Sequence, residues 1–195
     1  MLLLNRKLYN QNGLTLVELL AVIALTALVS TLLFSITTKA IETTRIINQE
    51  NVLRDEADII MSKFFKTIYS LRQEQIVLNE IESKNGINTN YLYIANNLSR
   101  CERDEKGILK DKEACKDSSL PVGFETKNNI TKIKFLSEEY EIGNKGIQIS
   151  STSRIIGNPE DTTLFEIELI LNLINKRGKK EMTFKTEIQP IVKTK

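Results

Sequence analysis

The chain of 195 residues contains no histidine and no tryptophan. Histidine is the commonest general base and the commonest metal ligand in proteins, so its absence counts against an enzyme and against a metalloprotein. The sequence also lacks the GxxxxGK[ST] phosphate loop, the GxSxG nucleophile elbow and the HExxH zinc motif. We therefore predict that the protein is not an enzyme and has neither a cofactor nor a metal.

Cysteine is scarce as well, and Cys101 and Cys115 are the only two. Their spacing fits neither a CxxC redox pair nor a zinc quartet. Outside the cytoplasm a disulfide between them closes a loop of about 15 residues and adds roughly 3 kcal/mol of stability. Two unpaired thiols are the alternative. The acidic residues of the same segment do not have the EF-hand spacing, which favours a solvated loop over a calcium site: Asp104, Glu105, Asp111 and Glu113.

An excess of positive charge is also missing. The formal net charge is +2, and without Arg6 and Lys7 the chain has 25 basic and 25 acidic side chains. Near neutrality provides no overall attraction to nucleic acid. The local basic cluster formed by Lys176, Arg177, Lys179 and Lys180 is typical of a solvated turn, with contact to DNA as the alternative.

Glycine and proline are absent between Gly13 and Gly86. We therefore predict an uninterrupted helix from Leu14 to about Leu71. Residues 14–36 are almost wholly apolar, and about 20 such residues cross a bilayer. Because Arg6 and Lys7 precede this span, the positive-inside rule places the N-terminus in the cytoplasm and the rest of the chain outside.

The second half of this helix, residues 37–85, is amphipathic. Apolar residues recur at steps of three, four and seven and predict one buried stripe: Ile46, Leu53, Ala57, Ile60, Phe64, Ile68 and Leu71. This stripe needs a partner surface.

A single acidic residue, Glu18, interrupts the apolar span near its beginning. The string NGLTLVELLAVIALTALV around it resembles the prepilin signature of type IV pilins and of the pseudopilins of secretion and competence systems. The resemblance covers roughly the first 30 residues. One departure from the family pattern is Leu14, where most members have phenylalanine.

This resemblance implies that residues 1–13 are a leader peptide. A prepilin peptidase would cut after Gly13, the new amino group of Leu14 would be N-methylated, and Glu18 would be the family's assembly glutamate. Implied partners are the peptidase, other pilins or pseudopilins, the membrane and an inner-membrane assembly platform, with nucleic acid possible only in a competence system. The expected product is a minor subunit of an extracellular or periplasmic filament.

Physical chemistry gives Glu18 a reason to be there. After cleavage the Leu14 ammonium and the Glu18 carboxylate lie at i and i+4 on one helical face, and a carboxylate in the first turn is favoured by the helix dipole. In a filament, Glu18 would instead neutralise the amino group of a neighbouring subunit. A glutamate reaching the interface from a plain anchor is the alternative.

Residues 86–195 change to short runs of period two separated by turns. YLYIA, ITKIKFL, EYEI and GIQIS predict strands, and TLFEIELILNLI with EMTFKTEI predicts an antiparallel hairpin. The apolar stripe of the helix is available to cover one face of this sheet, so the predicted fold is α+β and pilin-like. Residues 99–122 have no clear periodicity and are expected to form a charged loop.

Two further hypotheses belong to other functional classes. An unprocessed, membrane-anchored binding module would recognise a ligand through its sheet and loop. A cell-surface enzyme has no group of residues to support it.

Overall fold

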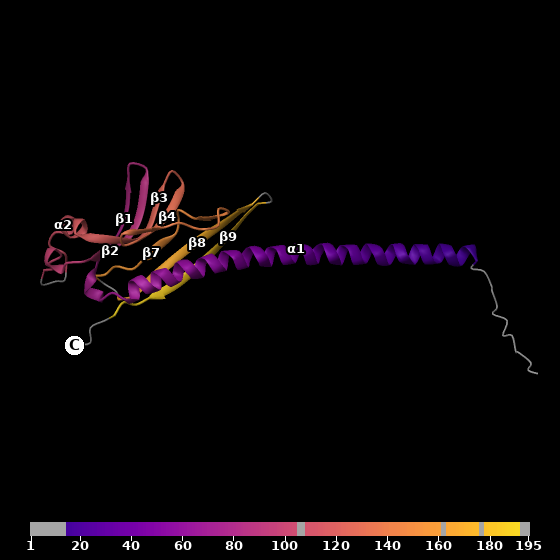
Figure 1. Ribbon diagram of the computed structural model, residues 1–195, viewed down its shortest axis with the longest axis horizontal. Coiled ribbons are helices and arrows are strands. Elements are labelled where there is room, and N and C mark those ends of the chain that lie inside the picture. Colours follow the sequence, from indigo (N-terminus) through magenta and orange to yellow (C-terminus); the bar gives the residue numbers. More distant parts are fainter. Residues whose placement is uncertain (1–14, 105–107, 161–162, 176–177, 192–195) are drawn as a thin grey trace, which may run out of the picture. The chain divides into compact units, whose positions relative to one another are not determined.

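The computed structural model describes residues 15–104, 108–160, 163–175 and 178–191. The chain divides into two compact units, residues 1–47 and 48–195. Helix α1 (Leu16–Tyr69) contributes to both units, and the second unit adds an antiparallel sheet (Figure 1). The long apolar helix and the antiparallel sheet packed on its second part confirm the predicted α+β fold.

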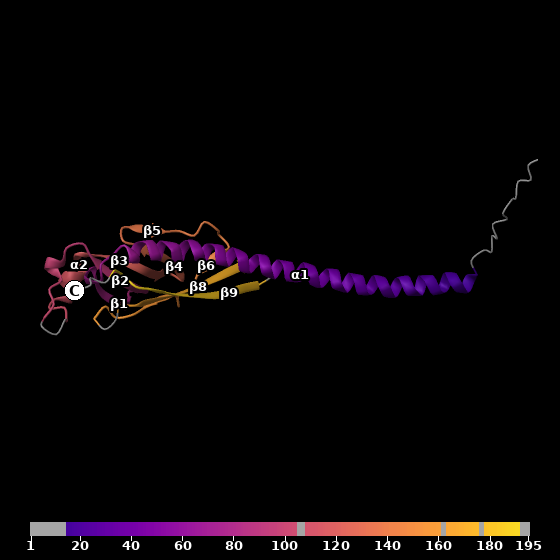
Figure 2. The ribbon, with the colours of Figure 1, turned by 90° about the horizontal axis from the view of Figure 1, so that it is seen from below.

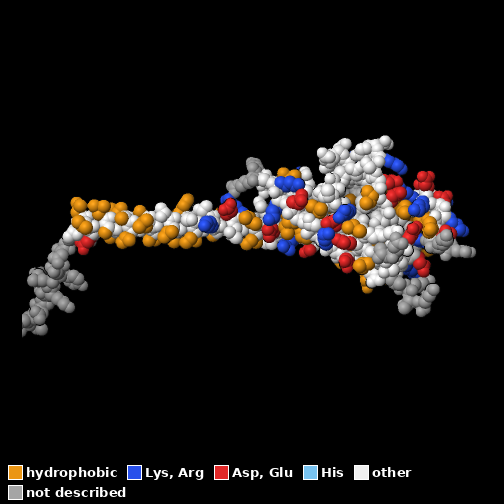
Figure 3. All heavy atoms as spheres, turned by 180° about the vertical axis from the view of Figure 1, so that it is seen from behind, with side chains coloured by type: hydrophobic (Ala, Val, Ile, Leu, Met, Phe, Trp, Pro, Cys, Tyr) orange, Lys and Arg blue, Asp and Glu red, His pale blue; other side chains and the backbone are white. Residues whose placement is uncertain are grey.

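The described part of the first unit is the N-terminal part of α1, and its side chains are exposed. Hydrophobic side chains cover the face visible in Figure 3. By length and composition α1 is able to cross a membrane. The hydroxyls of Thr26, Thr31 and Thr37 donate to carbonyls three or four residues earlier, so these polar groups are satisfied without water.

In the second unit, the predicted apolar stripe is buried from Leu53 onward: Leu53, Ala57, Ile60, Phe64 and Ile68, together with Met61. Ile46, at the start of the predicted stripe, is 45% exposed and does not belong to it. The ring of Phe64 lies 5.6 Å from that of Phe124 and 4.7 Å from that of Phe135. Phe64 therefore joins the helix to the sheet.

Helix α1 ends at Tyr69. The prediction of a helical region over residues 37–85 is therefore wrong over its last part. After Tyr69 comes a short 3₁₀ turn, η1 (Gln73–Gln75), and then strand β1 (Ile76–Lys84). The backbone of Ile191 donates to the Leu71 carbonyl (3.0 Å) and accepts from the Gln73 amide (3.1 Å). Pairing with a distant segment, rather than a Gly or Pro, accompanies the end of this helix.

The strands after β1 are β2 (Ile87–Ala95), β3 (Ser119–Lys127), β4 (Ile130–Phe135), β5 (Glu138–Tyr140), β6 (Ile147–Ile149), β7 (Arg154–Ile156), β8 (Phe165–Asn175) and β9 (Gly178–Ile188). Their order is β1-β2-β3-β4-β6-β8-β7, with β5 paired to β4 and β9 paired to β8. All these pairs are antiparallel. The β8–β9 hairpin and the strands expected at YLYIA, ITKIKFL, EYEI and GIQIS are confirmed in type.

Two tight turns join the first four strands in pairs. Asn85 and Gly86 have φ of 54° and 75° between β1 and β2, and Asn128 and Asn129 have φ of 51° and 62° between β3 and β4. Two central residues with positive φ are typical of type I′ hairpin turns. The sheet therefore starts at Ile76, ten residues before the predicted boundary at residue 86.

One face of the sheet packs on α1. Side chains that alternate along β8 are fully buried there: Phe165, Ile167, Leu169 and Leu171. Strand β5 lies beside α1 (Figure 2). Its last residue, Tyr140, donates from its hydroxyl to Glu56 at 2.6 Å, and the Lys63 ammonium lies 4.5 Å from the Tyr140 ring centroid.

The other face of β1 and β2 is covered too. The prediction of an irregular loop over residues 99–122 is wrong in part, because this stretch holds α2 (Lys112–Asp117) and the start of β3, after the 3₁₀ turn η2 (Leu98–Arg100). Asp111 caps α2 by accepting from the Ala114 amide (3.0 Å). A second small core lies beneath: Val77, Tyr91, Tyr93, Ala95, Cys101, Leu109 and Cys115.

Candidate processing and assembly site

The described structure begins just after the expected leader junction. Gly13 and Leu14 lie outside the described residues, and the description begins at Thr15. Thr15 precedes the first helical residue, and its carbonyl accepts the first helical bond, from the Leu19 amide at 3.1 Å. Thr15 is therefore the N-cap of α1.

Glu18 and Thr15 cap this helix reciprocally. The Glu18 Oε2 accepts from the Thr15 amide and from its Oγ1, both at 2.9 Å, and the Glu18 amide donates to the Thr15 Oγ1 at 3.3 Å. This is a capping box, in which two amides without helical partners are satisfied. The role of Thr15 was not predicted, although the pattern Thr-x-x-Glu before an apolar run is the sequence signature of such a box.

The surroundings of Glu18 are apolar and exposed. Its neighbours Leu16 and Leu19 are 76% and 54% exposed, and no other charged residue occurs between Leu14 and Thr38. A carboxylate offers about four lone-pair sites and the cap uses two, so Glu18 can accept from further donors. The remaining acceptor positions of Glu18 can bind a cation.

The cysteines are joined in the structure. Cys101 and Cys115 form a disulfide, with Cα atoms 4.7 Å apart, and both are buried, Cys115 on the inner side of α2. The disulfide ties the segment before α2 to the helix itself, so the segment covers Tyr91 and Tyr93 as part of the second core.

Lys116 of α2 binds the edge of the sheet. Its Nζ donates to Glu80 and Glu82 (2.6 Å each) and lies 5.1 Å from the Tyr93 ring centroid. Burial disfavours the ammonium, but the hydrogen bonds to the two carboxylates outweigh it and raise the pKa of Lys116. The same contact lowers the pKa of Glu82.

A similar group surrounds Tyr91. Its hydroxyl donates to Glu125 (2.5 Å), which also accepts from Lys134 (2.6 Å). Burial and then the hydrogen bond to Glu125 raise the pKa of Tyr91, while the Lys134 hydrogen bond lowers that of Glu125. Each charge here is paired, so the group fits a structural role.

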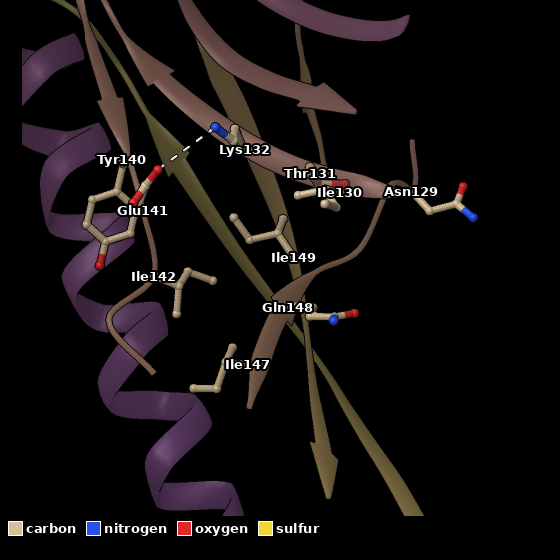
Figure 4. A pocket seen from close by; sticks show the side chains of 10 residues that line it. All are labelled: Asn129, Ile130, Thr131, Lys132, Tyr140, Glu141, Ile142, Ile147, Gln148 and Ile149. Atoms are coloured by element: carbon tan, nitrogen blue, oxygen red, sulfur yellow. Dashed lines mark ion pairs between the residues drawn. The ribbon is translucent and has the colours of Figure 1, made fainter. Parts of the chain in front are cut away.

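The structure has a cavity of about 320 Å³ where β4 and β6 diverge (Figure 4). The two strands share one residue pair, Thr131 with Ile149. Isoleucines line much of the cavity, and an ion pair between Lys132 and Glu141 (3.9 Å) lies beside it. Among the described residues, no group of three or more Cys, Asp or Glu side chains is placed to hold a metal ion.

Comparison with known proteins adds one match. Residues 8–34 match the family described as the prokaryotic N-terminal methylation motif. No curated protein and no solved structure is significantly similar to the chain. The match contains Thr15, Glu18 and the first part of the apolar helix. The chain therefore carries the signature of type IV pilins and pseudopilins at the start of a pilin-like α+β fold.

Proposed function

We propose that the chain is a prepilin that is cut between Gly13 and Leu14 by a prepilin peptidase, methylated at the amino group of Leu14, and assembled into a pilus or pseudopilus. One observation carries this proposal. The methylation motif at residues 8–34 contains the start of an exposed apolar helix in which Glu18 is the sole charge before Lys39.

The capping box supports this function because it lies wholly on the mature side of the proposed cut. Thr15 and Glu18 both remain after residues 1–13 are removed, so the start of α1 is preserved. The new ammonium on Leu14 then lies one residue before the N-cap. Its charge and the Glu18 carboxylate, either of the same chain or of a neighbouring subunit, lower each other's cost in an apolar setting.

The topology follows from charge and redox chemistry. Arg6 and Lys7 keep the leader in the cytoplasm, where the peptidase acts, and the second unit lies outside. A disulfide between Cys101 and Cys115 is stable in such an oxidising compartment. The partners are then other pilins and an inner-membrane assembly platform.

Within this function we favour a minor subunit. The last hairpin is long, since β8 and β9 have eleven residues each, as in the larger minor pilins. Glu18 is retained, so the subunit can pair laterally with those below it and is not the topmost one.

The mass of the N-terminal peptide from native membranes tests processing. We expect a peptide that begins at Leu14 with one added methyl group, and a peptide that begins at Met1 in cells without the peptidase. A wild-type chain that still begins at Met1 would reject the proposal.

The role of Glu18 is tested by Glu18→Gln, which keeps an acceptor for the Thr15 amide but removes the charge. If the charge serves assembly, this variant is cut normally and its yield in sheared filaments falls by about tenfold or more, as expected for one unpaired ammonium in an apolar contact. Thr15→Ala is the matched control, because it removes the side-chain cap and keeps the charge. Normal filament yield for Glu18→Gln would leave Glu18 a capping residue alone.

An unprocessed, membrane-anchored binding module is the second candidate. The capping box gives Glu18 a role without cleavage, and the cavity between β4 and β6 is of a size that holds a small ligand. The same N-terminal mass separates the two candidates.

A further inference from the structure

A short segment covers the second core, and one covalent bond closes it. Residues 98–118, here called the cap segment, contain η2 and α2. Among the described residues of the cap segment only three are buried: Cys101, Leu109 and Cys115. Two of these three form the disulfide, so most of the apolar contact that the cap segment makes with the second core surrounds this bond.

The noncovalent contacts of α2 are too weak to hold it in place. Lys116 donates to Glu80 and Glu82 of β1, but all three side chains are partly exposed, and such ion pairs add little stability. Helix α2 has six residues, and isolated helices shorter than about 12 residues are marginal in water. Chain entropy opposes the ordering of the cap segment, and the disulfide lowers this cost because it restricts the unfolded chain. The docked position of the cap segment therefore depends on the disulfide.

The main core is built without the cap segment. Its buried residues come from α1 and the sheet, and within the described chain they pass directly from Ile94 to Val122. The backbone pairing of β2 with β1 and β3 likewise uses no residue of the cap segment. Release of the cap segment therefore leaves the packing of α1 on the sheet intact.

We propose that the cap segment is a redox-controlled cover of the sheet. When the bond between Cys101 and Cys115 is reduced, the cap segment leaves the sheet while the main core stays folded, and oxidation returns it. Reduction uncovers the side chains that β1 and β2 contribute to the second core: Val77, Tyr91, Tyr93 and Ala95. The closed form shows a charged helix at this place and the open form shows an apolar face, so the redox state determines which surface the subunit presents.

The reaction is thiol–disulfide exchange with a dithiol. A thiolate of the dithiol attacks one cysteine sulfur and displaces the other cysteine, and the second thiol of the dithiol then displaces the first cysteine. Each released cysteine takes up one proton, two electrons pass to the protein, and the dithiol becomes a disulfide. Cys101 is 6% and Cys115 is 0% exposed, so the dithiol reaches the bond only when the cap segment opens locally.

This inference rests on the proposed function only for the compartment. The second unit lies outside the cytoplasm in that proposal, and the closed form is the stable one there. A chain whose second unit has not left the reducing cytoplasm keeps the open form. The tests below use purified protein, so a failure of leader cleavage or of filament assembly does not affect their result.

Hydrogen exchange of the full-length chain in detergent, with and without dithiothreitol, tests the switch. In the closed form the Lys110 amide donates to Glu102 (3.0 Å) and the Ser118 amide donates to Cys115 (3.2 Å). We expect reduction to speed the exchange of these amides by about tenfold or more and to leave the amides of β8 unchanged. Unchanged exchange in the cap segment would overturn the proposal, and so would a loss of protection in β8 together with the cap segment.

Tyrosine nitration of a variant with both Cys101→Ala and Cys115→Ala tests the uncovered surface without a reductant. Tyr93 is 8% exposed and its ring lies 5.1 Å from the Lys116 Nζ, so it reports on the cap segment. Tyr140, whose hydroxyl donates to Glu56 of α1, reports on the main core.

We expect nitration of Tyr93 to rise by about tenfold or more in the double variant and that of Tyr140 to stay as in the wild type. Ile108→Ala is the matched control, because Ile108 belongs to the cap segment but is 45% exposed, and it should leave Tyr93 protected. A Tyr93 that stays protected in the double variant, or one that is uncovered equally by Ile108→Ala, contradicts a cover held by the disulfide.

Discussion

Gly123 adopts a backbone angle that other residues rarely adopt. Its φ is +148°, and a Cβ built at this position would lie 2.2 Å from the Asn90 carbonyl oxygen of β2. Strand β3 can therefore pass close to β2 at this point only with glycine.

We predict that Gly123→Ala lowers the free energy of unfolding by about 2–4 kcal/mol, from backbone strain together with the clash. Gly178 is the matched control, because its φ is +144° and nothing lies within 4 Å of the added Cβ. Gly178→Ala should cost less, about 1–2 kcal/mol from strain alone. Urea unfolding followed by circular dichroism measures both, and equal losses would show that the approach to Asn90 does not matter.

The roles of some residues can be predicted from the local sequence, and those of others cannot. The Thr15-x-x-Glu18 pattern is sufficient to predict a capping box, because all its partners lie within one helical turn. The need for Gly123 depends on a strand that lies more than thirty residues earlier, so no local pattern reveals it.

At the scale of the helix, the apolar stripe determines the contribution of each side chain. We predict that Phe64→Ala costs about 3–5 kcal/mol, since Phe64 is fully buried against Phe124 and Phe135. The adjacent Phe65 is 41% exposed, and Phe65→Ala should cost less than about 1 kcal/mol. Denaturant midpoints of the two variants, compared with the wild type, check this difference.

The contact between α2 and β1 should depend on pH. The hydrogen bond from Lys116 lowers the pKa of Glu82 from its ordinary 4.5 in the folded state. Its stabilising effect is therefore present above the ordinary pKa and is lost as the pH falls through the folded value. We predict that Lys116→Met removes up to about 1 kcal/mol near pH 7 and loses less stability than the wild type on acidification.

Lys112→Met is the control for this experiment, because Lys112 is exposed on the same helix α2. Thermal unfolding between about pH 7 and about pH 3 gives the acid slope of each variant. Identical slopes for the wild type and Lys116→Met would mean that the ion pairs with Glu80 and Glu82 contribute nothing.

Elements whose apolar residues follow a clear period could be predicted from the sequence. Elements that depend on pairing with distant segments could not. The buried stripe from Leu53 and the β8–β9 hairpin follow from spacing alone. Strand β1 was hidden because no Gly or Pro precedes it, although the Asn85–Gly86 pair is a hairpin signal. Strand β3 contains Pro121 and Gly123, which usually argue against a strand.

For the whole molecule, the core draws on α1 only from Leu53 onward, and the side chains of residues 15–48 are largely exposed. We predict that a fragment beginning at Asn48 is water-soluble and unfolds cooperatively. A fragment beginning at Phe65 loses Leu53, Ile60 and Phe64 and should not fold, since these losses exceed the 5–15 kcal/mol typical of a domain. Calorimetry of both fragments distinguishes the two cases, and a folded fragment from Phe65 would contradict the core described here.

The backbone pairing of Ile191 with the end of α1 has a consequence for folding during synthesis. A ribosome makes the apolar stripe first and its cover last, because 96 residues separate Ile68 from Phe165 and more must follow before Ile191 can meet Leu71. Until then the buried side chains of α1, from Leu53 to Ile68, lack the core residues that β8 and the end of β9 contribute. The nascent chain therefore exposes the apolar stripe of α1 until almost the whole chain has been synthesised. We expect the need for chaperones to be greatest during this period.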